Sequence, residues 1–232
     1  MARKKKKSTK NSKMRHLITN LNPRSPVSEQ YRTVRTNIQF SSVDNLLQAI
    51  LVTSAGPGDG KSMTTANLAV VYAQQGKRVL LIDADMRKPT MHYTFRLDNL
   101  KGLSNVLVGE SPLTETIAPS DVDNLDVLSC GPIPPNPSEL LASEKMARTI
   151  EEARNIYDVI LFDTPPVLAV TDAQVLANLC DGSLLVARSK QTEYEAAQNA
   201  IQALQAGNTK ILGTILNDMT KKESNYYYYY GS

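Results

Sequence analysis

The fold of this chain is decided by the stretch Ala55-Gly56-Pro57-Gly58-Asp59-Gly60-Lys61-Ser62. It follows the Walker A pattern, with alanine in place of the usual first glycine. Small residues let the backbone N–H groups of such a loop converge on phosphates, and a following helix points the positive end of its dipole at them. The lysine would bridge the outer phosphates and the serine hydroxyl would bind Mg²⁺. We therefore expect ATP and Mg²⁺ as cofactors.

The residues on either side favour a phosphate-binding loop over a simple glycine-rich turn. The apolar run 49–52 predicts a strand before the loop, and residues 62–75 predict a helix that Gly76 ends. This order of strand, loop and helix is the context that the Walker A pattern requires. The residues expected to contact the nucleotide are Gly56, Pro57, Gly58, Asp59, Gly60, Lys61, Ser62 and Met63.

Outward from the loop, apolar runs alternate with helical patterns, which predicts a mostly parallel sheet with helices on both faces. The expected strands are 78–83, 125–128, 159–162, 183–187 and 211–216. The expected helices are 28–40, 138–154, 172–179 and 193–206, with small helices in 89–124. The chain then divides into a disordered basic arm (1–27), a P-loop α/β domain (28–218) and a C-terminal tail (219–232).

Two predicted strands end in aspartates, Asp83 with Asp85 on one and Asp163 on the other. Because parallel strands present their carboxyl ends at one edge, these carboxylates should face the phosphates. Asp83 is the candidate base, with Asp85 and Asp163 nearer the metal, although Asp83 and Asp85 could exchange roles. We expect the metal to be held by Ser62, Asp85 and Asp163. Asn217, at the end of the last strand, would either bind the purine base or form a plain turn.

Composition places the chain among ordinary globular proteins, with 41% hydrophobic and 21% charged residues. The net charge of +3 conceals eight positive charges before position 16, while the rest of the chain carries 18 basic and 23 acidic residues. Such an arm could bind lipid headgroups or nucleic acid, or could merely keep the chain soluble. No apolar run is long enough for a membrane span or a secretory signal, so we expect a cytoplasmic protein. Cys130 and Cys180 are expected to be core thiols.

The C-terminal tail is the unusual feature of the sequence. It carries five consecutive tyrosines, half of the ten in the chain, namely Tyr226, Tyr227, Tyr228, Tyr229 and Tyr230. Five adjacent aromatic residues at a chain end cannot all find core positions. They could form an interaction or stacking surface. As phosphate acceptors they have a simpler explanation, because several sites would grade the negative charge that is added.

Together these residues resemble the bacterial tyrosine kinase family, in particular the separate kinase chain of Gram-positive bacteria. The resemblance rests on three segments, 55–62, 80–87 and 159–166, and on the tyrosine cluster. Glu29, Arg32 and Arg35 match the family's E-x-x-R-x-x-R oligomerisation helix, whereas Asp59 stands where the family usually has glutamate. The resemblance implies autophosphorylation on the tyrosine cluster and ring-shaped homo-oligomers. It also implies a membrane adaptor that holds the kinase at the inner face of the membrane, a cognate tyrosine phosphatase, and a role in capsular or extracellular polysaccharide synthesis and export. Nucleic acid is not an expected partner.

Two other functions fit parts of the sequence. Partitioning and septum-positioning ATPases are dimeric switches with a similar loop, but they place a second lysine directly after the first glycine position, where this chain has Gly56. A scaffold that only binds partners through its tail would leave Lys61, Asp83, Asp85 and Asp163 without a role. The missing lysine and the tyrosine cluster both favour a protein-tyrosine kinase.

Overall fold

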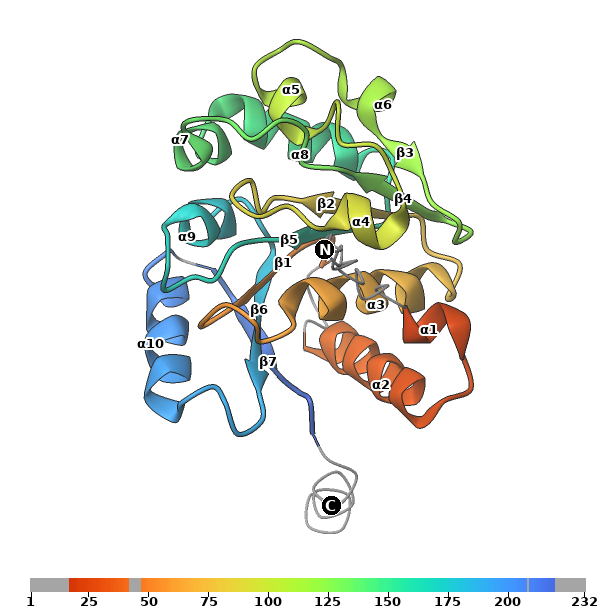
Figure 1. Ribbon diagram of the computed structural model, residues 1–232, viewed down its shortest axis with the longest axis vertical. Coiled ribbons are helices and arrows are strands. Elements are labelled where there is room, and N and C mark those ends of the chain that lie inside the picture. Colours follow the sequence, from red (N-terminus) through yellow and green to blue (C-terminus); the bar gives the residue numbers. More distant parts are fainter. Residues whose placement is uncertain (1–16, 42–46, 208, 220–232) are drawn as a thin grey trace, which may run out of the picture.

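The described part of the chain forms one mostly parallel sheet flanked by helices (Figure 1), in a computed structural model that covers residues 17–41, 47–207 and 209–219. The order of its seven strands is β3-β4-β2-β5-β1-β6-β7, and within it only β3 runs antiparallel to its neighbour. The strands are β1 (Ala49–Ser54), β2 (Val79–Asp83), β3 (Ala118–Pro119), β4 (Leu125–Leu128), β5 (Val159–Asp163), β6 (Gly182–Arg188) and β7 (Ile211–Asn217). The predicted P-loop α/β fold is confirmed, and β3 is an addition to the predicted strands.

Helices cover both faces of the sheet, with α1 to α3 on one side and α9 and α10 on the other (Figure 1). The first five are α1 (Ile18–Leu21), α2 (Pro26–Phe40), α3 (Lys61–Ala73), α4 (Met91–Phe95) and α5 (Leu103–Leu107). The others are α6 (Leu113–Thr116), α7 (Pro137–Leu141), α8 (Glu144–Arg154), α9 (Asp172–Ala177) and α10 (Tyr194–Gln205). Short helices α4, α5 and α6 occupy the segment 89–124 as expected.

Continuous apolar strands are buried because each face of the sheet packs on helices. In β1, Ile50 and Val52 pack in the cluster that contains α3, whereas Leu51 packs in the cluster that contains α8 and α9. Successive side chains of a strand point to opposite faces, so a strand buried on both faces needs no polar alternation. Full burial of one such aliphatic side chain contributes about 2 kcal/mol of stability. The central strands therefore hold the loops at their carboxyl ends in fixed positions.

The helix predicted over 138–154 is two helices. Ser143 stands between α7 and α8, and its hydroxyl accepts a hydrogen bond from the backbone N–H of Met146 at 3.2 Å. A serine that caps a new helix satisfies one of the N–H groups that a helix start leaves without a partner. Local capping thus outweighs the continuous apolar pattern. The break turns α7 toward α9, which it contacts.

The described structure begins before position 28, where the sequence placed the start of the domain. The hydroxyl of Thr19 in α1 donates to the side-chain oxygen of Asn67 in α3 at 2.8 Å, and Thr19 is fully buried. Gln74 of α3 donates to the carbonyl of Thr19 at 2.9 Å. Two polar contacts, the first of them buried, therefore attach α1 to the helix that follows the phosphate-binding loop. Residues 1–16, which include most of the predicted arm, lie outside the described residues.

Helix α2, predicted over 28–40, packs against α3. Ile38 is buried, and Tyr31 and Val34 pack against the same cluster. Phe40, the last residue of the helix, is 73% exposed. Both cysteines are free thiols; Cys130 is buried in the core as expected, whereas Cys180 is half-buried and packs against the core. Among the helices in the described part of the chain, none has the length and apolarity needed to cross a bilayer.

Candidate active site

The loop 55–60 joins β1 to α3 in the conformation that a phosphate-binding loop needs. Gly58 and Gly60 have φ angles of +92° and +93°, which glycine adopts without strain. A Cβ atom at Gly60 would lie 2.0 Å from the side-chain nitrogen of Asn217. Only glycine fits there, because both the backbone angle and the neighbouring side chain exclude a larger residue. The loop therefore lies directly against the end of β7.

Asp59 holds this loop together. One carboxylate oxygen accepts the backbone N–H of Gly56 at 3.1 Å, and the other accepts the hydroxyl of Thr192 at 3.0 Å. The backbone carbonyl of Asp59 accepts a hydrogen bond from the side chain of Asn217 at 2.9 Å. These bonds preform the loop and attach it to the chain after β6 and to β7. The amide nitrogen of Asn217, expected either at a purine base or in a turn, thus has a partner in the loop itself.

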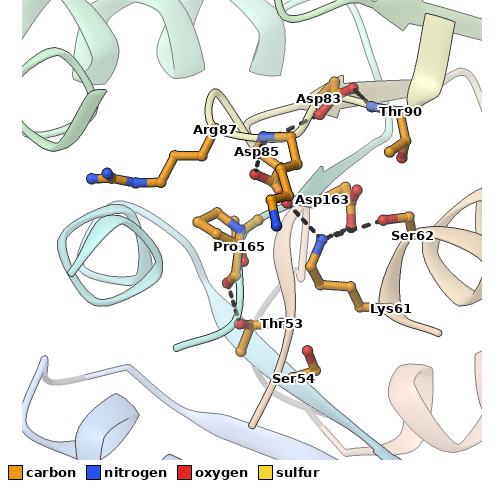
Figure 2. A network of polar contacts seen from close by, with 12 residues as sticks. Thr53, Ser54, Lys61, Ser62, Asp83, Asp85, Arg87, Thr90, Asp163 and Pro165 are labelled. Atoms are coloured by element: carbon orange, nitrogen blue, oxygen red, sulfur yellow. Dashed lines mark hydrogen bonds and ion pairs between the residues drawn. The ribbon is translucent and has the colours of Figure 1, made fainter. Parts of the chain in front are cut away.

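Lys61 lies within reach of two carboxylates (Figure 2). Its Nζ atom is 2.9 Å from Asp85 Oδ2 and 3.6 Å from Asp163 Oδ1. Burial lowers the pKa of Lys61, but the negative charges of Asp163 and Asp85 outweigh it and raise this pKa above its ordinary value. The lysine is therefore a permanent cation at neutral pH. Three predicted residues from the start of α3, the loop after β2 and the end of β5 are brought together, which is the arrangement that adjacent parallel strands predict.

Asp83 is fully buried, and its carboxylate holds the loop that follows β2. One oxygen accepts the backbone N–H groups of Thr90 and Met91, both at 2.9 Å, and the other accepts the N–H of Asp85 at 3.3 Å. Burial and the neighbouring Asp163 carboxylate raise the pKa of Asp83 to about 7. A carboxylate with this pKa is able to take up a proton near neutral pH. Asp83 thus combines a structural role with a protonation behaviour that suits a base.

The residues present fit Mg²⁺. Both carboxylate oxygens of Asp163 are buried without a hydrogen-bond partner among the described residues, and the Lys61 contact is longer than a hydrogen bond. Burial raises the pKa of Asp163, against the lowering effect of Lys61. Nothing in the described ranges forms a cage of three or more His, Cys, Asp or Glu side chains. Mg²⁺ needs no such cage, because it binds one or two carboxylates together with phosphates and water.

The predicted oligomerisation residues lie on α2, and both arginines have partners within their own chain. Arg32 pairs with Glu29 and also donates to the carbonyl of Pro23 at 2.8 Å. Arg35 instead donates to the carbonyl of Val71 in α3 at 2.7 Å. One of the three residues thus contacts the P-loop helix of its own chain. The five predicted acceptors, Tyr226 to Tyr230, lie outside the described residues.

Several residues around the site have no signal in the sequence. They are Thr90, Met91, Ser138, Asp172 and Thr192, which contact Asp83, Arg87 or Asp59. Thr90 and Met91 contribute only backbone N–H groups, so no residue type could mark them. Ser138, Asp172 and Thr192 are ordinary polar residues at helix starts, and only the tertiary contact distinguishes them.

Comparison with known proteins places this geometry in a family. Residues 47–212 match the AAA domain family. Tyrosine-protein kinase YwqD of Bacillus subtilis is 52% identical over 218 residues, which are 94% of this chain and 92% of that protein. Tyrosine-protein kinase CpsD of Streptococcus agalactiae is 40% identical over 85% of each chain. The crystal structure of the chimerical protein CapA2B2 is 42% identical, with a TM-score of 0.85 over 88% of this chain and 90% of that one.

More distant structures share the fold alone. The septum site-determining protein MinD of Pyrococcus horikoshii, complexed with Mg-ADP, is 24% identical with a TM-score of 0.64 over 77% of this chain and 76% of that one. The Mg-ADP belongs to that protein, and the likeness shows that this chain has the same fold. The functional comparison therefore rests on the relatives with higher identity.

Proposed function

The chain belongs to the family of bacterial tyrosine-protein kinases, and on this premise we propose that it transfers the γ-phosphoryl group of ATP to the tyrosine cluster at its own C-terminus. The cluster of Lys61, Asp85 and Asp163 beside the preformed loop carries this proposal. It offers one cation for the transferring phosphoryl group and two buried carboxylates for a metal. The tyrosines Tyr226 to Tyr230 supply acceptors on the same chain.

The proposed transfer forms a bond between the tyrosine oxygen and the γ-phosphorus and breaks the bond to the oxygen that bridges the β- and γ-phosphates. Lys61 leaves Asp85 and neutralises charge on the outer phosphates. Asp83 takes the tyrosine proton, or Asp85 does if the two exchange roles. Bound Mg²⁺, held by Ser62, Asp85 and Asp163, would supply further charge neutralisation. ADP leaves with the bridging oxygen.

The decisive experiment is to incubate the purified protein with ATP and Mg²⁺ and to map phosphotyrosine by mass spectrometry. The proposal expects modification within residues 226–230. A parallel sample should contain a fragment of the membrane adaptor, because the proposed adaptor would increase the yield. If ATP is hydrolysed but no tyrosine is modified in either sample, the switch ATPase becomes the better explanation.

The alternative function is a partitioning or septum-positioning type of switch, favoured by the likeness of the fold to MinD. Such a switch would need a second lysine in the loop, but position 56 is glycine. Among the described residues, the cation that lies near this part of the loop is Arg188 of the same chain, whose guanidinium is 3.5 Å from the carbonyl of Gly58. Dimerisation that depends on ATP, without phosphotyrosine, would support this alternative.

We propose the wider context from the family resemblance. A membrane adaptor would hold the kinase at the inner face of the cell membrane, and the chain would act in capsular or extracellular polysaccharide synthesis or export. Kinase chains would assemble as a ring, and a tyrosine phosphatase would reverse the modification. Each phosphorylated tyrosine adds about two negative charges, so full modification would repel the tail from the acidic site.

Replacing Glu29, Arg32 and Arg35 together with alanine should convert the oligomer to monomers. The three side chains are proposed to support contact with a neighbouring subunit, and light scattering measures the assembly mass. An unchanged mass would mean that these residues form only an intrachain network, worth well under about 1 kcal/mol at its exposed positions.

The contact of Arg35 with Val71 requires a control for this experiment. Arg35→Ala alone should lower thermal stability, because it removes a charged hydrogen bond to α3. The double variant Glu29→Ala/Arg32→Ala leaves that contact intact. If only variants that lack Arg35 dissociate, the effect comes through α2 packing and not through a shared surface.

Phosphorylation is expected to occur between subunits. About 13 residues follow Met219, and at roughly 3.3 Å per residue they could reach some 40 Å. This reach includes the chain's own site as well as a neighbour's, so the length of the tail does not determine whether transfer occurs within one chain or between subunits. Oligomerisation would favour transfer between subunits, because it holds a second site at high effective concentration.

A mixing experiment separates the two routes. Chains that carry Lys61→Met and an intact tail are mixed with active chains that lack residues 224–232. Phosphotyrosine on the Lys61→Met chains is the expected result. If mixed oligomers form and those tyrosines stay unmodified, transfer takes place within one chain.

A further inference from the structure

A second polar cluster lies beside the carboxylates but outside the phosphate-binding site. The guanidinium of Arg87 donates from Nε to Asp172 Oδ2 and from Nη2 to Asp172 Oδ1, both at 2.9 Å. Nη2 also lies 3.3 Å from the hydroxyl of Ser138, and that hydroxyl in turn donates to Asp172 Oδ1. We call these three residues the Arg87 clamp. Neither the proposed chemistry nor the predicted site residues account for it.

The clamp joins three loops at the carboxyl edge of the sheet. Arg87 belongs to the loop after β2, Ser138 starts the region of α7 that follows β4, and Asp172 opens α9 after β5. Figure 2 shows the side chain of Arg87 extending away from Lys61 and Asp163. It therefore does not face the position where phosphates would bind. Any effect of Arg87 on the reaction must act through the loop that carries it.

That loop also carries Asp85, two residues before Arg87. One oxygen of Asp85 accepts the backbone N–H of Lys88 at 3.0 Å, and the other contacts Lys61 at 2.9 Å. The turn 85–88 thus encloses Arg87, and its backbone bond orients the Asp85 carboxylate. A shift of Arg87 would move both ends of this turn. The geometry of Asp85 toward Lys61 depends on where Arg87 is held.

The burial of Asp172 explains why the clamp holds. Its side chain is 0% exposed, whereas that of Arg87 is 41% exposed. A buried carboxylate without its cation is strongly unfavourable, and a two-pronged guanidinium contact satisfies both of its oxygens. Arrangements of the loop that withdraw Arg87 are therefore costly. The exposed arginine is confined by its buried partner.

We propose that Arg87 is a positioning residue that acts through Asp172 and Ser138 to hold the Asp85 carboxylate in the orientation that binds Mg²⁺ with ATP. The expected effect of Arg87 on kcat rests on the proposed function. The expected effect on Mg²⁺ binding does not, because the Mg²⁺ dependence of nucleotide binding can be measured without any phosphoryl transfer.

The test measures binding of a fluorescent ATP analogue as a function of Mg²⁺ concentration, together with kcat and KM for tyrosine phosphorylation. Arg87→Ala should raise the Mg²⁺ concentration at half-saturation and lower kcat by about tenfold each, the range found when residues behind a metal ligand are changed. Affinity for the analogue in EDTA should stay within about twofold of wild type. Arg87→Lys should recover only part of the loss, because an ammonium cannot make the two-pronged contact.

Asp172→Asn should give the same Mg²⁺ defect as Arg87→Ala, and the double variant should be no worse than either single one. Ser138→Ala provides a milder variant that should fold if Asp172→Asn does not, with a smaller defect of the same kind. Arg78→Ala is the matched control. Arg78 forms an ion pair with Asp158 at the opposite edge of the sheet, at 3.1 Å, and its loss should leave both measurements unchanged.

The proposal is overturned if Arg87→Ala matches Arg78→Ala in Mg²⁺ dependence, or if the Arg87 and Asp172 defects add. Absence of phosphotyrosine in the wild type would remove the proposed function, yet the binding measurement would still decide whether the clamp orients Asp85.

Discussion

Lys61→Met should abolish phosphotyrosine formation, with a loss of at least about 100-fold in kcat. Lys61 is the cation beside the buried carboxylates, at 2.9 Å from Asp85 and 3.6 Å from Asp163. A thioether of similar length fills the space but provides no charge for the outer phosphates. Without Lys61 the acidic site would also repel ATP. Phosphotyrosine is measured by mass spectrometry after incubation with ATP and Mg²⁺.

Lys77→Met is the control for this experiment. Lys77 is exposed and precedes β2, at the edge of the sheet opposite the carboxylates. It should retain wild-type activity, which shows that loss of one positive charge elsewhere does not matter. Tail phosphorylation at the wild-type level in Lys61→Met would contradict the kinase mechanism.

Asp83→Asn should remove most of the activity, by about 100-fold or more if Asp83 is the base. Asparagine cannot take the tyrosine proton. It also has one acceptor oxygen where the carboxylate has two, so it cannot accept all the N–H groups of Asp85, Thr90 and Met91. The loop after β2 should therefore loosen, at a cost of about 1 to 3 kcal/mol for a buried N–H left without a partner.

The pH dependence of stability checks the state of Asp83 without reference to activity. Its folded pKa of about 7 lies above the ordinary value of 3.8, so the folded protein holds this proton more tightly than the unfolded chain. The resulting stability is fully present below pH 4 and is lost as the pH rises through about 7. Asp83→Asn should remove this decline from denaturant unfolding curves, whereas Asp158→Asn at the far edge should keep it.

Activity and stability together distinguish the roles of Asp83. A kcat within about threefold of wild type in Asp83→Asn would exclude it as the base and leave Asp85 for that role. A large loss of kcat with an unchanged decline in stability would instead mean that the proton on Asp83 does not titrate in the folded protein.

Much of the fold follows from local sequence. The strands after positions 78 and 158 are apolar runs ended by aspartate, and a run buried on both faces belongs in a parallel sheet. The loop 55–62 specifies its own conformation, because its glycines permit positive φ angles and its neighbours form a strand and a helix. The edge strand β3 has only two residues, Ala118 and Pro119, and gives no such pattern.

The sequence also predicted which charged residues meet. Lys61 starts a helix, Asp163 ends a strand and Asp85 lies in the loop just beyond the end of another strand, and parallel strands bring those ends to one edge. The parallel topology of the sheet thus brings residues with local sequence signals together in one site. The sequence pattern does not give the direction in which each side chain points. The contact of Arg35 with α3 of its own chain could therefore not be predicted from it.

The sequence by itself therefore determined most of the central strands, the phosphate-binding loop and the acidic edge, because each depends on residues within one turn or strand. Tertiary structure alone decided the side-chain contacts that lie outside this pattern. Arg87 meets Asp172 and Asp59 meets Thr192 across gaps of 85 and 133 residues. Such pairs have no local signal, since any exposed arginine or threonine looks the same in sequence. The packing of the loops at the sheet edge brings each pair together. Separating either pair would cost free energy, because it would leave a buried carboxylate without its partner.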